Sequence, residues 1–338
     1  MNIAQIGVGN WGRNLLRTFS RLEGVTLTVA CDTDGTLLKR LSADYPNVKF
    51  TANVKEVLND PGIEAVVIAT SSETHADLTR KSLESGKHVF VEKPLALSTK
   101  DAESVVGLAE KTKKTVMVGH LLKYHPAYVR VKEIIDRGDL GEVYYLYSTR
   151  VNLGIVRRSE NALWSLAPHD VATALMFLKE KPTAVSATGR CFLQKEIEDV
   201  VFLEVAFQKG KMAHLHVSWL DPHKIRKVTV VGSKRMAVID DMEPTEKIRV
   251  YDKGVSQTKE YTTYGEALTV RDGDIAIPYV KMQEPLRLEC EHFIDCVKRK
   301  VRPFSDALDG LNVVRILDAA HQSLKRQGQP VHLNEARI

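Results

Sequence analysis

Hydrophobic positions in the first third of the chain form short continuous runs separated by segments of helical periodicity. The strand-like runs are residues 3–7, 27–31, 48–51, 65–70, 89–91 and 116–119, and the helical patterns are 11–22, 36–44, 54–58, 76–85 and 99–111. Strands that alternate with helices of this length imply right-handed crossovers and a parallel sheet. Apolar runs with little alternation indicate strands buried on both faces. The pattern therefore predicts an α/β domain with a doubly wound parallel sheet.

The pattern changes after residue 120 to an alternation of period two. It predicts strands at 143–151, 184–190, 200–207, 212–220, 227–232, 236–240 and 247–251, and helices at 125–137, 168–178, 284–299 and 308–326. The short connection 208–211 is typical of a hairpin. We expect an α+β domain with a large, mostly antiparallel open sheet, one face of which is exposed or covered by a partner. A chain of 338 residues suits two domains, which we place at 1–121 and 122–338.

Composition narrows the functional classes. The 43% hydrophobic and 27% charged residues are typical of a soluble globular protein, and no apolar run is long enough to cross a membrane. The chain opens on a strand pattern without a signal peptide, and its four scattered cysteines form no Cys-x-x-Cys pair, so we expect a cytoplasmic protein without a metal site. The net charge of +5 is dispersed, which argues against a nucleic-acid partner.

A glycine-rich turn follows the first predicted strand and opens the first predicted helix. In Gly7-Val8-Gly9-Asn10-Trp11-Gly12 the glycines permit a tight turn and close approach of a pyrophosphate, and the helix N-terminus supplies amides and a favourable dipole. Methyltransferases and simple turns share this motif. Asp32, 25 residues after Gly7, ends the second strand, where an acid can bind both adenosine ribose hydroxyls. The alternative for Asp32 is a helix cap or a turn residue before Gly35. Its carboxylate repels a 2′-phosphate, so we predict NAD rather than NADP.

Two later strand ends carry polar residues where ligands bind in such sheets. Glu92-Lys93-Pro94 ends the fifth strand, and Pro94 restricts the backbone so that Lys93 is aimed. A lysine at this position can stabilise negative charge that develops on a reacting oxygen. The alternative is that Lys93 is an exposed strand-end lysine without a catalytic role. We expect Glu92 to interact either with groups around Lys93 or with the nicotinamide ribose. Thr70 and His75 are expected to line the nicotinamide half, although a structural hydrogen bond explains His75 equally well.

These motifs, together with Gly119-His120 and a later His169-Asp170, resemble the glucose-fructose oxidoreductase/inositol dehydrogenase/MocA (Gfo/Idh/MocA) family over nearly the whole chain. The resemblance implies an N-terminal Rossmann domain and a C-terminal domain whose open sheet mediates dimers or tetramers. It also implies reversible oxidation of a sugar or cyclitol hydroxyl by a nicotinamide cofactor, with Lys93 catalytic and the Lys93–Pro94 bond often cis. The cofactor contacts expected here are Gly7, Gly9, Asn10, Trp11, Gly12, Asp32, Thr70, His75, Glu92, Lys93 and His120.

The second domain supplies the expected base. Pro168 suits the first turn of a helix and would place His169 near its N-terminus, where the dipole favours a neutral imidazole. The resemblance makes His169 the general base, and a capping or packing role is the alternative. Many family members carry an acid where this chain has Ser165. A hydroxyl orients an imidazole without stabilising its charge, so Asp170 or Glu92 compensates, the base is weaker, or Lys93 shares the proton transfer.

The segment 152–170 looks like that of members which oxidise nucleotide-linked N-acetylamino sugars. Arg157 and Arg158 would clamp a diphosphate and Trp164 would stack on a ring, whereas solvated arginines and a core Trp are the alternative. The expected substrate contacts are Lys93, Tyr124, Asn152, Arg157, Arg158, Trp164, His169 and Asp170. An inositol or free-sugar dehydrogenase, and a regulatory protein that binds NAD without turnover, remain alternatives.

Overall fold

The computed structural model describes residues 1–154, 156–158, 160–257 and 268–333, and the chain divides into two compact units. The first unit consists of Met1–Tyr124 and Glu284–Asp318, and the second of His125–Gln283 and Ala319–Ile338. The single boundary expected near residue 121 takes no account of Glu284–Asp318, which packs with the N-terminal sheet. Each unit is therefore built from two separate stretches of sequence.

The first unit contains a six-stranded parallel sheet in the order β3-β2-β1-β4-β5-β6. Its strands are β1 (Asn2–Ile6), β2 (Thr26–Cys31), β3 (Lys49–Thr51), β4 (Ala65–Ile68), β5 (His88–Glu92) and β6 (Val116–Gly119). Its helices are α1 (Gly12–Phe19), α2 (Gly35–Asp44), α3 (Val54–Leu58), α4 (Ser72–Glu84), α5 (Thr99–Thr112), the 3₁₀ helix η1 (Leu121–Tyr124) and α8 (Pro285–Arg299). The predicted doubly wound sheet is confirmed.

Helix α8 joins this unit through aromatic packing. Phe293 of α8 lies edge-on to Phe90 of β5 and Phe19 of α1, with ring centroids 5.8 and 6.4 Å apart, and all three side chains are buried. Such contacts add to the free energy gained by burying the rings. The sequence pattern identified the helix but not the sheet against which its apolar face packs.

The second unit contains a nine-stranded sheet in the order β14-β13-β12-β11-β7-β10-β9-β8-β15. Its strands are β7 (Val143–Val151), β8 (Pro182–Arg190), β9 (Val200–Phe207), β10 (Met212–Ser218), β11 (Ile225–Gly232), β12 (Met236–Asp240), β13 (Ile248–Gln257), β14 (Leu268–Ala276) and β15 (Val331–His332). Only β7 and β10 pair in parallel among the described strands of this sheet, so the mostly antiparallel prediction is confirmed.

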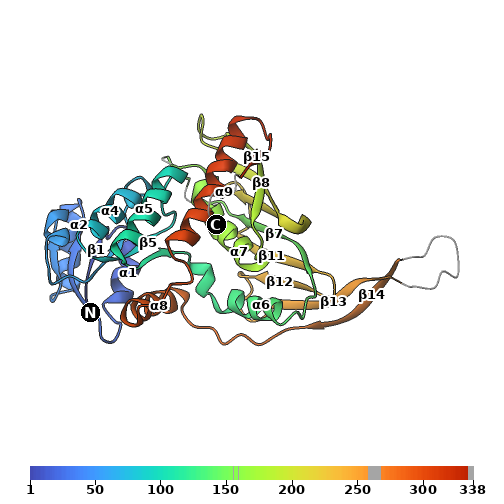
Figure 1. The fold of residues 1–338 in the computed structure, drawn as a ribbon, viewed down its shortest axis with the longest axis horizontal. Coiled ribbons are helices and arrows are strands. Elements are labelled where there is room, and N and C mark those ends of the chain that lie inside the picture. Colours follow the sequence, from blue (N-terminus) through green and yellow to red (C-terminus); the bar gives the residue numbers. More distant parts are fainter. Residues whose placement is uncertain (155, 159, 258–267, 334–338) are drawn as a thin grey trace. The chain divides into compact units, whose positions relative to one another are not determined.

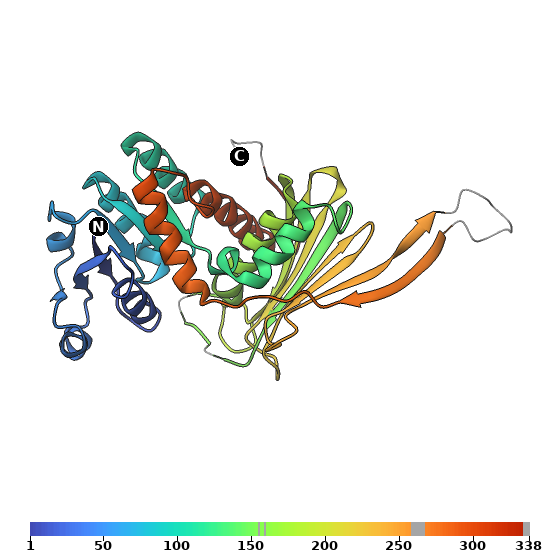
Figure 2. The ribbon, with the colours of Figure 1, turned by 90° about the horizontal axis from the view of Figure 1, so that it is seen from below.

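Helices α6 (Pro126–Asp136) and α7 (Ala162–Leu178) pack on one face of this sheet, and α9 (Ala307–Lys325) ends in the same unit (Figure 2). On strand β9, Val201 and Leu203 are fully buried while Phe202 between them is 44% exposed. Strand β13 was predicted only in part, over residues 247–251, and β14 was not predicted. They form a ribbon that extends beyond the other strands of the sheet (Figure 1), and its exposed, charged positions lack clear alternation.

No helix within the described residues is long and apolar enough to span a membrane. Of the four cysteines, Cys31, Cys290 and Cys296 are buried thiols and Cys191 is an exposed one. Across the same described ranges, no group of three or more histidine, cysteine or carboxylate residues is arranged to hold a metal ion.

Candidate active site

The glycine turn between β1 and α1 has the geometry that a dinucleotide requires. Gly7 has a φ of +91°, and a Cβ atom there would lie 2.5 Å from the carbonyl oxygen of Ala69. A Cβ atom on Gly12 would collide with the carbonyl oxygen of Gly7. At Gly9, by contrast, a Cβ atom would meet no described atom within 4 Å, so the backbone there is open to a phosphate. The turn therefore fits the pyrophosphate of NAD.

Asp32 lies beside this turn at the end of β2. One carboxylate oxygen accepts a hydrogen bond from the amide of Val8 at 2.7 Å, and the other accepts one from the amide of Asp34 at 3.1 Å. A carboxylate offers about four acceptor positions, so two remain for ribose hydroxyls. The cap of helix α2 is Asp34, whose side chain accepts from Thr36 and Leu37. The helix cap is therefore Asp34 and not Asp32, whereas the bond from the amide of Asp34, two residues on, is typical of a turn residue and agrees with the turn alternative for Asp32.

Lys93 directly follows β5, next to a buried carboxyl that is tied to the glycine turn. Glu92 accepts a hydrogen bond from the indole Nε1 of Trp11 at 2.5 Å and from the backbone amide of Lys93 at 3.3 Å. Burial raises the pKa of Glu92 to about 7, and the contacts with Trp11 and Lys93 oppose that shift. The Lys93–Pro94 peptide bond is cis. The link from Trp11 to Glu92 joins residues 81 positions apart and was not predicted.

His75 connects the ends of β4 and β5. Its Nδ1 lies 2.7 Å from the carbonyl oxygen of Pro94, and its Nε2 lies 3.1 Å from that of Thr70. The ring is buried, and burial lowers the pKa of His75. Thr70 and Thr74 share a hydroxyl–hydroxyl bond of 2.6 Å. These contacts favour the structural alternative for His75, and its contact with the cofactor stays a prediction.

His120 follows β6 and is almost fully buried. Among the described residues, neither of its ring nitrogens has a hydrogen-bond partner. Burial, with smaller contributions from the charges of Lys123 and Lys93, lowers the pKa of His120 to about 3. The ring is therefore neutral. The predicted contact of His120 with the cofactor stays a prediction.

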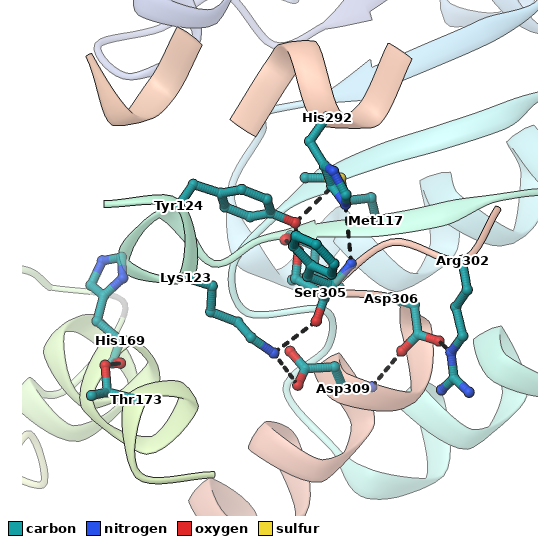
Figure 3. Close-up of polar contacts among 12 residues, drawn as sticks. Met117, Lys123, Tyr124, His169, Thr173, His292, Arg302, Ser305, Asp306 and Asp309 are labelled. Carbon is teal, nitrogen blue, oxygen red and sulfur yellow. Dashed lines mark hydrogen bonds and ion pairs between the residues drawn. The ribbon is translucent and has the colours of Figure 1, made fainter. Parts of the chain in front are cut away.

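Tyr124 belongs to a polar cluster inside the first unit (Figure 3). Its hydroxyl bonds to Ser305 Oγ at 2.9 Å, and Ser305 donates to the carbonyl oxygen of Val118 at 2.7 Å. The neighbouring Lys123 donates to Asp309 at 2.5 Å. Tyr124 is only 6% exposed, so these contacts give it a structural role and lend no support to the predicted substrate contact. Ser305 and Asp309 were missed because about 180 residues separate them from their partners.

The helix that carries His169 begins earlier than predicted. Asn161 accepts a hydrogen bond from the amide of Trp164 at 3.1 Å and caps α7, which then includes Pro168 in its interior. His169 therefore lies about two turns into the helix, and the prediction that it sits near the N-terminus is wrong. The helix dipole therefore gives no reason for His169 to be neutral, because the dipole acts on charges only within the first turn of a helix. Ser165 does lie one turn before His169 on the same side of α7.

Asp170 forms a buried ion pair. It accepts from Arg150 Nε at 2.6 Å, from a second guanidinium nitrogen at 3.2 Å, and from Ser148 Oγ at 2.6 Å. The side chains of Arg150 and Asp170 are 4% and 1% exposed. These bonds attach α7 to β7 and occupy the carboxylate, so they support a structural role and not the predicted substrate contact.

The predicted substrate segment is only partly supported by its contacts. Arg157 and Arg158 are exposed, and Arg157 forms an ion pair with Glu160 at 2.9 Å. Trp164 is 7% exposed, which favours the core alternative over stacking on a sugar. Asn152 is half-buried. The segment's residues 155 and 159 lie outside the described ranges.

Comparisons with known proteins agree with this geometry. Residues 1–120 match the family described as "Oxidoreductase family, NAD-binding Rossmann fold", and residues 128–238 match the GFO/IDH/MocA C-terminal domain. The scyllo-inositol 2-dehydrogenase (NAD(+)) of Bacillus subtilis is 27% identical over 99% of this chain and 96% of its own length.

Two solved structures share the fold. UDP-N-acetylglucosamine 3-dehydrogenase GnnA from Acidithiobacillus ferrooxidans has a TM-score of 0.81 at 21% identity, covering 97% of this chain and 98% of its own. GenD2 from gentamicin A biosynthesis, in complex with NAD, has a TM-score of 0.83 at 23% identity, covering 99% and 96%. The two family matches show that the chain belongs to the GFO/IDH/MocA family of oxidoreductases and that residues 1–120 have the family's NAD-binding Rossmann fold.

Proposed function

We propose that this protein is an NAD-dependent dehydrogenase that oxidises a secondary hydroxyl of a sugar or cyclitol. The observation that carries the proposal is the position of Lys93, directly after β5 and beside Glu92, which is bonded to Trp11 of the glycine turn. Ligands of doubly wound sheets bind outside the carboxyl ends of the strands. Bound NAD supplies the hydride acceptor, and the chain supplies binding, orientation and proton transfer.

In the proposed reaction Lys93 donates a hydrogen bond to the reacting hydroxyl oxygen and stabilises the negative charge that develops there. His169 accepts the hydroxyl proton as the hydride leaves the same carbon. Ser165, one turn before His169, has no carboxylate to stabilise an imidazolium, and Asp170 is occupied by Arg150. We therefore propose that Lys93 carries a larger share of the proton chemistry than in relatives with an acid at that position.

Asp32 supports NAD as the preferred cofactor. Its carboxylate lies beside the glycine turn, where a 2′-phosphate would be repelled, and neither Thr33 nor Asp34 offers a positive charge. The test is turnover with each cofactor at equal concentration, and a clear preference for NADP would contradict the assignment.

Two substrate classes fit the proposal. The exposed Arg157 and Arg158 support a nucleotide-linked N-acetylamino sugar, because guanidinium groups bind diphosphates through paired hydrogen bonds. The full-length similarity to scyllo-inositol 2-dehydrogenase supports an inositol equally. The ion pair of Arg157 with Glu160 would have to open for a diphosphate clamp to form.

A thermal-shift panel with NAD present separates the two classes, because a ligand that binds only the folded state raises the melting temperature. UDP-N-acetylamino sugars, inositols and free sugars are compared, and turnover is then followed at the NADH absorbance band. Lys93→Met and His169→Asn should each lower kcat by about 10²- to 10⁴-fold. Full activity of His169→Asn would remove it from the mechanism. NAD binding without turnover on any sugar would favour the regulatory alternative.

We also propose a homodimer or homotetramer formed through the open sheet of the second unit. On the face opposite α6 and α7, Tyr147 and Phe202 are 43% and 44% exposed, and His216 stacks on Phe202 with ring centroids 4.4 Å apart. Clustered exposed aromatic side chains are typical of protein interfaces. Light scattering of the wild type and of Phe202→Glu tests this, and a monomeric wild type would contradict it. A cytoplasmic location stays a prediction.

A further inference from the structure

Two buried carboxyl groups lie together in the first unit, next to the aromatic contact between β5 and α8. Phe90 and Glu92 project from the same face of β5, since they are two residues apart. Glu289 and Phe293 lie one turn apart on the same side of α8. The rings of Phe90 and Phe293 are in contact at 5.8 Å, and the negative charge of Glu92 acts on Glu289. The two carboxyl groups therefore lie on the facing sides of β5 and α8, close enough for the charge of Glu92 to act on Glu289.

The two groups differ in their hydrogen-bond partners. Glu92 accepts from Trp11 Nε1 and from the amide of Lys93. Glu289 is 1% exposed, and within the described part of the chain neither of its carboxyl oxygens has a partner. An ionised carboxylate without donors is costly to bury, so Glu289 is held in its neutral form. Its pKa is raised well above the ordinary value, first by burial and then by the charge of Glu92.

The groups around the pair leave Glu92 as the one that titrates near neutral pH. Lys93 adds a positive charge that opposes the effect of burial, yet the pKa of Glu92 still lies at about 7. The other neighbours are neutral through this range: Trp11 at the start of α1, His120 after β6 with its lowered pKa, and Tyr124 of η1 and Cys290 of α8 with their raised pKa values.

We propose that Glu92 and Glu289 form a carboxyl pair that couples the redox state of the bound cofactor to pH, in which Glu289 keeps its proton and Glu92 loses one when NAD⁺ binds. The physical reason is charge: the oxidised nicotinamide ring is positive and the reduced ring is neutral. An anionic Glu92 near the ring favours the oxidised form. When the cofactor is reduced, Glu92 rebinds one proton from solvent. The coupling rests on the proposed place of Glu92 in the cofactor site.

The pair itself can be tested without cofactor, because Trp11 reports on Glu92. Of the three tryptophans, Trp11 is 43% exposed while Trp164 and Trp219 are buried. Indole fluorescence of the NAD-free protein should change with a midpoint near pH 7. The transition should be absent in Glu92→Gln and in Trp11→Phe, and unchanged in the control Glu84→Gln, which alters an exposed carboxyl of α4. A transition that persists in Glu92→Gln would overturn the pair.

Glu289→Gln tests which member keeps its proton. Because the replaced group is neutral, the midpoint should move by less than about half a pH unit. A downward shift of about one unit or more would mean that Glu289 carries a charge beside Glu92, and would refute the proposed division of roles. Thermal unfolding of each variant shows whether it is folded before its titration is compared.

Calorimetry tests the coupling to the cofactor. Binding is measured at pH 7 in two buffers of different protonation enthalpy, so that the difference gives the protons released. NAD⁺ should release about half a proton and bind about tenfold more tightly at pH 8 than at pH 6, while NADH should change by less than about twofold. Both effects should vanish in Glu92→Gln. Equal proton release with NAD⁺ and NADH would overturn the coupling. No sugar is present in these assays, so a failure of the proposed substrate class leaves them interpretable.

Discussion

Replacing Asp170 with Asn should destabilise the protein severely, because it leaves a buried guanidinium without its anion. Asp170 accepts three hydrogen bonds, two from Arg150 and one from Ser148, and neither member of the ion pair is more than 4% exposed. Asn keeps the shape of Asp170 but removes the charge and turns an NH₂ group toward donors. Breaking a buried pair in this way costs about 3–5 kcal/mol.

Urea unfolding measures this loss as a change in the free energy of unfolding at constant m-value. The matched control is Glu133→Gln, which removes the anion of an exposed pair with Arg130 on α6 and should cost less than about 1 kcal/mol. The double variant Arg150→Met/Asp170→Leu should recover most of the loss, since it leaves no buried charge unpaired. If Asp170→Asn unfolds like the wild type but loses substrate affinity, Asp170 contacts the substrate and the structural reasoning is refuted.

Three further predictions concern the first unit. Asp32→Ser should weaken NAD binding by about tenfold and narrow its advantage over NADP, as measured by titration with both cofactors. Gly7→Ala should abolish NAD binding and lower the free energy of unfolding by well over about 1 kcal/mol, because its Cβ would strike the carbonyl oxygen of Ala69. The control Gly86→Ala also has a positive φ, of 73°, but open space around its Cβ, so it should lower the free energy of unfolding by only about 1 kcal/mol. The pKa of Glu92 in the folded protein is about 7, against an ordinary value of 4.5. The contribution of its protonated form to the free energy of unfolding is therefore complete below pH 4.5 and is lost as the pH rises to 7. Glu92→Gln should therefore equal the wild type in acid and exceed it by about 3 kcal/mol above pH 7 in urea unfolding, and equal stabilities at pH 8 would contradict the raised pKa.

Local patterns predicted much of the fold and part of the site. The apolar runs located the six parallel strands, because a strand buried on both faces must be apolar throughout. The glycine spacing and Asp32 predicted a dinucleotide site for a similar reason. A tight turn and the close approach of a ligand to the backbone each require a particular residue at a particular position.

The start of α7 shows where local rules fail. Pro168 was interpreted as a first-turn residue, yet Asn161 caps the helix and tertiary packing holds Pro168 in its interior. Proline is unfavourable there, but a helix with nearly every side chain buried gains more from packing than it loses in one hydrogen bond.

The sequence by itself determined which residues can turn tightly, bind a pyrophosphate or form a buried strand, because those properties depend on a residue and its near neighbours. Only the tertiary structure decided which distant groups meet. Trp11 bonds to Glu92, Asp170 pairs with Arg150, and α8 packs on β5 so that the charge of Glu92 acts on Glu289. Burial then sets the charge of these groups, since the cost of an ion depends on what surrounds it and not on its place in the chain.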